Sequence, residues 1–178
     1  MTAGKIGFGC VLCTLASAWQ PGCNVNPTQG YTLRSQYPTN VRTVSVPMWT
    51  RGREVYRRGL EMRLTEALVK QIEHDTPYKV TKSVRADTQL KGTIDRVTQQ
   101  VLTINPDDGL PREIEVMLEV SFRWTDLRTG KVLRERKGFR VAGTYVPSGP
   151  FREDFFHGSE DTINRLARRI VEQMQADW

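Results

Sequence analysis

The sequence has few of the residues that carry metal or thiol chemistry. Its 178 residues include three cysteines and two histidines, and no cysteine lies beyond position 23. The chain contains neither a His-Glu-x-x-His pattern nor a Gly-x-Ser-x-Gly elbow, so the common metalloprotease and serine-hydrolase motifs are absent. The glycines Gly4, Gly7 and Gly9 are not followed by the strand and helix of a nucleotide site. We therefore expect no enzymatic activity, no metal and no cofactor.

The N-terminal apolar run is too short to span a membrane. Ile6–Ala18 has 13 uncharged residues, fewer than the roughly 20 that a spanning helix needs. One lysine precedes this run and a short polar exit follows it, which is the layout of a secretory signal peptide. Cys10 and Cys13 form a Cys-x-x-Cys pair inside this leader, so we expect both to be removed with it. The sequence predicts a signal peptide at residues 1–22.

Two cleavage sites compete at the end of the leader. Ala16–Ala18 fits the small-x-small rule and would leave a chain that begins at Trp19. Gly22–Cys23 fits a bacterial lipoprotein site, although Gln20–Pro21 departs from the usual pattern. A lone Cys23 thiol in an oxidising compartment would need its own explanation, so we favour lipidation of Cys23. Residues 23–40 then form a polar tether behind the anchor, and residues 41–178 form a single domain.

Positive charge exceeds negative charge in this chain. Lys and Arg total 26 against 20 Asp and Glu, which gives a formal net charge of +6. This balance favours an anionic partner such as nucleic acid, lipid or a membrane surface. The export signal argues against nucleic acid, and no aromatic stacking strand accompanies the basic residues. We expect no nucleic-acid partner.

Two groups of basic residues stand out. A group at the entrance of the first predicted helix is the candidate anion site, because guanidinium groups bind phosphate or carboxylate in a bidentate way. The alternative for this group is an ordinary solvated surface, which we also expect for the basic residues within Arg128–Arg140. The candidate contacts with an anionic ligand are Arg51, Arg53, Arg57 and Arg58.

Hydrophobic periodicity predicts the main strands. Apolar residues occupy every even position from Ile114 to Trp124, which indicates a long strand with one buried face. Leu90–Ile104 precedes it across an Asn-Pro-Asp-Asp-Gly turn. Val132–Tyr145 follows it, with a β-bulge expected near Gly138. Shorter strands are predicted at Val41–Met48 and from Tyr78 to Val84.

Two segments have apolar residues at the spacing typical of a helix. Arg51–His74 carries an apolar stripe from Leu60 to Ile72, and a second stripe runs from Ile163 towards the C-terminus. Helices and strands that each have one apolar face pack most simply in two layers. We predict an α+β fold in which two helices pack on one face of a mixed, roughly four-stranded sheet, in the order β-α-β-β-β-α.

The order of short motifs resembles that of the LptE-like lipopolysaccharide-assembly lipoproteins. The resemblance covers roughly residues 30 to 178 and implies the same two-helix, four-stranded mixed fold. The motifs that carry it are Gly30–Tyr31, Val44–Pro47, Gly59–Leu68, Ala86–Ile94, Asp126–Leu133 and Leu166–Val171.

The resemblance implies a function without catalysis. Proteins of this kind are lipid-anchored at the periplasmic face of the outer membrane, sit as a plug inside a large β-barrel translocon similar to LptD, assist its assembly and bind lipopolysaccharide during transport. The expected partners are therefore the barrel, lipopolysaccharide and the membrane through the N-terminal lipid. The alternative is an exported lipoprotein that serves as a structural or accessory module of another envelope complex. An exported hydrolase is a third and weaker alternative.

Overall fold

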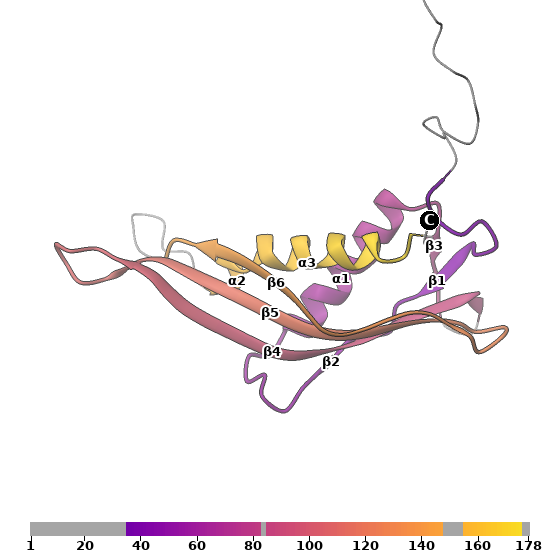
Figure 1. Cartoon of the computed structure of the whole chain (residues 1–178), viewed down its shortest axis with the longest axis horizontal. Coiled ribbons are helices and arrows are strands. Elements are labelled where there is room, and N and C mark those ends of the chain that lie inside the picture. The colour runs from indigo at the N-terminus through magenta and orange to yellow at the C-terminus, as the bar shows by residue number, and fades with distance from the viewer. Residues whose placement is uncertain (1–34, 83–84, 148–154, 176–178) are drawn as a thin grey trace, which may run out of the picture. The chain divides into compact units, whose positions relative to one another are not determined.

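The computed structural model describes residues 35–82, 85–147 and 155–175. The predicted signal peptide, the lipidation site Cys23 and residues 24–34 of the predicted tether lie outside these described residues. The elements in the described part follow one another as two strands, a helix, four strands and two helices. Figure 1 shows the helices gathered on one face of the sheet, as predicted.

Three long strands form the predicted antiparallel meander. They are β4 (Thr88–Ile104), β5 (Pro111–Asp126) and β6 (Val132–Tyr145). The central strand β5 pairs with both neighbours, for example Val120 with Ile94 and with Phe139. Its predicted alternation is confirmed, because all five even-numbered side chains from 116 to 124 are buried. They face the helices, and the odd-numbered residues leave the other face of the sheet open.

Three short strands extend the sheet, so its strand count is six and not the predicted four. β1 (Thr43–Ser45) pairs in parallel with both β3 (Lys79–Val80) and β4, and β2 (Thr50–Arg51) pairs in parallel with β4 farther along. The strand order is β3-β1-β4-β5-β6, with β2 beside β4. Pro47 lies between β1 and β2 and has no N–H to donate, so one extended segment is divided into two short strands.

The first helix begins nine residues later than predicted. α1 spans Leu60–Asp75, whereas the sequence predicted Arg51–His74. The backbone N–H of Gly52 donates to Ile94 O at 2.8 Å, so the chain is still following β4 at this point. Gly59 then takes φ 91° at the N-cap, a left-handed conformation that starts the helix abruptly. The buried stripe of α1 is the predicted one and includes Leu60, Leu64, Leu68 and Ile72.

The second helical region contains a single turn, α2 (Phe155–Gly158), and the longer α3 (Glu160–Glu172). α3 buries one face that includes Leu166 and Ile170, and it packs beside α1 on the sheet. One hydrophobic core therefore lies between the two long helices and the even-numbered side chains of β5.

Residues 35–40 contact this core directly. Tyr37 packs edge-on against Tyr78, with ring centroids 5.8 Å apart, and the Tyr78 hydroxyl donates to Pro38 O at 3.2 Å. Tyr78 is almost fully buried, and burial raises the pKa of its phenol, with a smaller contribution from Tyr37. This short segment is thus attached to the domain before β1 begins.

Candidate functional site

Two of the four candidate arginines make contacts within the domain. Arg51 lies in β2 and forms an ion pair with Glu61 of α1, at 3.1 Å between Nε and Oε1. Arg57 donates to the side-chain oxygen of Gln99 at 2.6 Å, and its guanidinium lies 3.8 Å from the ring centroid of Phe155. Both side chains therefore hold the β2–α1 loop against the rest of the fold.

The other two candidates, Arg53 and Arg58, are exposed in the same loop. Neither forms an ion pair or a hydrogen bond within the part of the chain that the structure describes. The four arginines thus form no single cluster of free cations. Arg53 and Arg58 stay candidates for an external anion, whereas a change at Arg51 or Arg57 would also disturb the loop.

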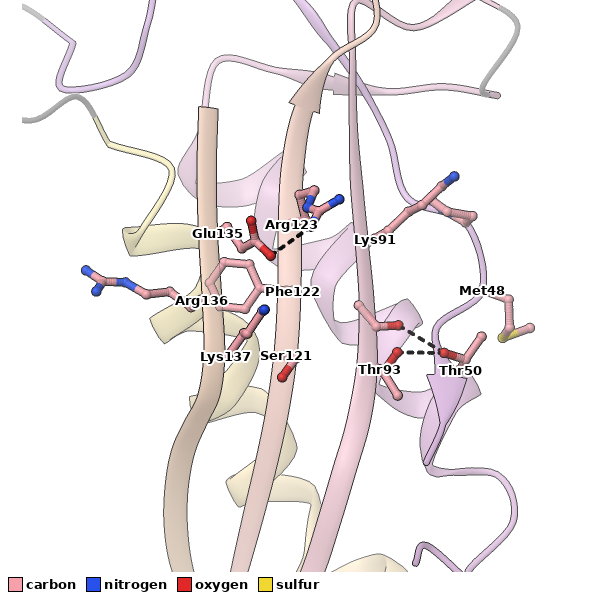
Figure 2. Close-up of a pocket in the computed structure, with 12 residues that line it drawn as sticks. Met48, Thr50, Lys91, Thr93, Ser121, Phe122, Arg123, Glu135, Arg136 and Lys137 are labelled. Atoms are coloured by element: carbon pink, nitrogen blue, oxygen red, sulfur yellow. Dashed lines mark hydrogen bonds and ion pairs between the residues drawn. The ribbon is translucent and has the colours of Figure 1, made fainter. Parts of the chain in front are cut away.

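The structure reveals a second candidate, which we call the open-face groove. It lies on the face of the sheet that the helices leave uncovered and has a volume of about 460 Å³. Figure 2 shows side chains from β4, β5 and β6 on one side and the segment around β2 on the other. Its lining residues are Pro47, Met48, Thr50, Lys91, Gly92, Thr93, Ser121, Phe122, Arg123, Glu135, Arg136 and Lys137.

The charge of the open-face groove is mainly positive. Four of its lining residues are cationic, and Glu135 is its single carboxylate. Glu135 is paired with Arg123 at 2.8 Å, which holds the pKa of Glu135 below its usual range. Lys91 and Lys137 are exposed and form no ion pair among the described residues. Their two ammonium groups are therefore available to an external anion.

The other wall of the groove is apolar because of how Trp49 is anchored. Trp49 is 2% exposed, its ring covers Gly92 on the helix side of the sheet, and its backbone N–H donates to Thr65 Oγ1 at 3.0 Å. The preceding residue, Met48, points outward and is 60% exposed. The hydroxyls of Thr50 and Thr93 lie 2.9 Å apart and fix β2 beside β4. The groove thus combines exposed hydrocarbon with free ammonium groups.

This combination suits a molecule with both apolar and anionic parts. The sequence analysis missed the groove because its residues come from four strands and the segment before β2, which only the sheet register brings together. One signal in the sequence could have found it. Lys91, Thr93, Ser121 and Arg123 are polar residues at odd-numbered positions of two strands, so they share the face opposite the buried side chains. Within the described ranges, no group of three or more His, Cys, Asp or Glu side chains could hold a metal ion. No described helix has the length and hydropathy to cross a membrane.

Comparison with known proteins gives a family-level result. The model of the LptE family, described as lipopolysaccharide-assembly, matches residues 41–178. No curated protein matches the sequence.

Several solved structures share the fold at low sequence identity. A PelC variant from Paraburkholderia phytofirmans, solved as a dodecamer, aligns with TM-score 0.51 and 14% identity over 79% of this chain and 95% of its own. Uncharacterized lipoprotein B from Nitrosomonas europaea aligns with TM-score 0.51 and 18% identity over 83% and 91%. A hypothetical protein from Chlamydia trachomatis aligns with TM-score 0.50 and 12% identity over 74% and 94%. At these identities the likeness concerns the fold alone.

Proposed function

Because this chain belongs to the LptE lipopolysaccharide-assembly family, we propose that it is a non-catalytic lipoprotein that binds lipopolysaccharide and plugs a β-barrel translocon similar to LptD. It would be anchored by lipid on Cys23 at the periplasmic face of the outer membrane. The observation that carries the ligand part of this proposal is the open-face groove, whose lining includes Lys91, Lys137 and the exposed Met48.

Lipopolysaccharide carries phosphate and carboxylate groups next to acyl chains. Lys91 and Lys137 can pair with the anionic groups, because neither has an ion-pair partner in the described part of the domain. Met48 and Pro47 offer a hydrocarbon wall beside them. The groove is far smaller than a whole glycolipid. It would therefore bind one phosphorylated part of the molecule, and the rest would stay outside the groove.

The open sheet face also supports the plug part of the proposal. Part of this face carries polar side chains that pair with one another, as in Glu119 with Arg140 at 3.0 Å and Ser121 with Asp95 at 2.5 Å. The inner wall of a large membrane β-barrel is polar as well. The paired positions of the face can lie against such a wall without burying unpaired charge.

A matched pair of variants tests the ligand site. Lys91→Glu with Lys137→Glu reverses two charges in the groove, and Arg53→Glu with Arg58→Glu makes the same charge change in the β2–α1 loop. We expect the groove variant to weaken binding of purified lipopolysaccharide at least about tenfold, because two attractive contacts become repulsive. The loop variant should bind within about twofold of the original chain, and circular dichroism checks that both variants fold.

Other outcomes of this experiment would contradict parts of the proposal. Loss of binding in the loop variant alone would assign the ligand to Arg53 and Arg58. Equal binding by all three proteins would show that neither group of cations holds the lipid. No binding by the original chain would reject the glycolipid role altogether.

The partner and the anchor need separate experiments. A pull-down from outer membranes with the full chain should recover a β-barrel of the translocon type, and recovery of a different envelope complex would support the alternative role as an accessory module. Mass spectrometry of the mature chain should find acyl groups on Cys23. A mature chain that begins at Trp19 without acyl groups would refute lipidation.

A further inference from the structure

The two edges of the sheet differ sharply in charge. β6 forms one edge and carries five charged side chains, together with a bulge at Gly138. The outer side of β4 is covered by β1 at Thr88–Gln89 and by β2 at Thr93–Ile94. Beyond that point no described strand pairs with this side of β4, although β5 pairs with its other side as far as Ile104. Figure 1 shows β4 continuing well past β2.

We call residues Thr98–Ile104 the free edge of β4. None of these seven residues is charged, and all of them are exposed. Val101 is 44% exposed, Leu102 47% and Ile104 59%, so three large apolar side chains lie near one another at the surface. Proteins commonly protect exposed strand edges with lysine, proline or a bulge, because an unprotected edge pairs with other strands. β6 has charged side chains and a bulge. The free edge of β4 carries no charge and no proline, and its register with β5 shifts between Val101 and Ile104.

We propose that the free edge of β4 pairs with the same edge of a second copy of this chain, as antiparallel strands related by a two-fold axis. A neutral partner strand suits this edge, because it places no charge beside the apolar side chains of Val101 and Leu102. A second copy meets this condition along its whole free edge. This inference is independent of the function proposed above.

The covered part of β4 limits how the two copies can pair. β1 and β2 occupy the first half of the outer side, so only Thr98–Ile104 is open to another chain. In an antiparallel arrangement, the covered half of each copy lies beyond the hairpin tip of the other copy. The two free edges can therefore overlap over about 24 Å without contact between β2 of one copy and β4 of the other.

Two other occupants fit the free edge less well. Insertion of the hairpin tip into a bilayer would carry the exposed carboxylates of Asp107 and Asp108 into the hydrocarbon, which is costly. A closed β-barrel has no free strand edge with which to pair. The second copy is therefore the occupant that the charges and the backbone favour.

Sedimentation of the full chain tests this proposal. The chain carries Cys23→Ser, so that an acyl group cannot bring two copies together. We expect both monomer and dimer to be populated at protein concentrations between about 1 and 300 µM. Gln100→Lys with Leu102→Lys should weaken the dimer about tenfold or more, because like charges then face one another. Val132→Lys with Thr144→Lys adds the same charge on β6 and should leave the dimer unchanged.

Amide hydrogen exchange supplies a second readout of the same dimer. Exchange at Thr98–Ile104 should slow as the concentration rises, and it should stay fast in the free-edge variant, whose other amides report whether it has folded. A monomer at every concentration would overturn the proposal. A dimer that survives the free-edge lysines, or one that the β6 lysines break, would overturn it as well.

Discussion

The carboxylate of Asp87 joins the first strand of the sheet to the start of β4. Its Oδ2 atom accepts hydrogen bonds at 3.0 Å from the backbone N–H of Arg42 and from the N–H and hydroxyl of Thr43. The Asp87 N–H in turn donates to the Thr43 hydroxyl at 2.8 Å. The bonds from Arg42 and Thr43 hold the pKa of Asp87 below its ordinary value.

Replacing Asp87 should therefore destabilise the domain. We expect Asp87→Ala to lower the free energy of unfolding by about 2 kcal/mol, because charge-assisted bonds to two adjacent residues are lost. Urea unfolding at pH 7 measures this change. Asp107→Ala is the control, because the Asp107 side chain accepts no hydrogen bond among the described residues, and it should change the stability by less than about 0.5 kcal/mol.

The same carboxylate predicts the response to acid. A carboxyl whose pKa is lowered by folding stabilises the fold fully above its unfolded pKa, near 3.9, and this contribution is lost as the pH falls through the lower folded pKa. We expect Asp87→Asn to lose less stability than the original chain between about pH 5 and pH 2. Urea titrations across this range measure the difference. Parallel pH curves for the two proteins would contradict the assignment.

Gly92 and Trp49 form a close contact that leaves no room for a β-carbon. An added β-carbon at Gly92 would overlap the six-membered ring of the Trp49 indole. We expect Gly92→Ala to cost about 1–3 kcal/mol of stability, because the buried ring must shift. In the Trp49→Leu background the same change should cost much less. Thermal unfolding of the four proteins in this cycle measures the coupling, and additive effects would show that the ring is not the cause.

Among the elements, β6 contains the bulge that the sequence predicted near Gly138. The register passes from Val120 with Phe139 to Phe122 with Arg136, so β6 has one extra residue. Gly138 takes φ 62° there, a left-handed conformation that costs other residues roughly 1–2 kcal/mol. We expect Gly138→Val to destabilise the domain by at least about this amount in urea unfolding. Gly138→Asn should cost less, because asparagine tolerates this conformation.

The sequence predicted the long elements and the short strands that contain β1 and β3, but it did not predict β2. The alternation from Ile114 to Trp124 and the stripe from Leu60 to Ile72 are signals of burial, and both are confirmed. β2 contains only two residues, which is too few for any periodicity. The helix start was wrong because Arg51 pairs with Ile94 of β4 rather than continuing into α1. That pairing joins residues 43 positions apart along the chain.

The candidate site was less predictable than the fold for a related reason. A run of arginines is visible along the chain, but the structure shows that Arg51 and Arg57 bind within the domain. The open-face groove joins Met48 to Lys91 and Lys137, and no local pattern relates these positions. Charge predicts an anionic partner for the molecule as a whole. Sheet register decides where on the surface that partner can bind.

For the whole molecule, the parallel pairing of β1 with β4 has a kinetic consequence. β4, β5 and β6 are joined by short turns, whereas β1 reaches β4 from 44 positions away. Since distant pairings form late, we expect the meander to fold first and β1 to join afterwards. Stopped-flow folding tests this order with two fully buried valines. Val120→Ala should slow folding, Val44→Ala should mainly speed unfolding, and the reverse pattern would contradict the order.

This order makes the folding intermediate more prone to aggregation than the native state. Before β1 and β2 have joined, the outer side of β4 is uncovered from Thr88 to Ile104, more than twice the length left free at the end of folding. A newly made chain then exposes a long strand edge whose backbone N–H and C=O groups have no partner strand. Aggregation during refolding should therefore grow steeply with protein concentration, and binding partners that reach β4 early would act as chaperones.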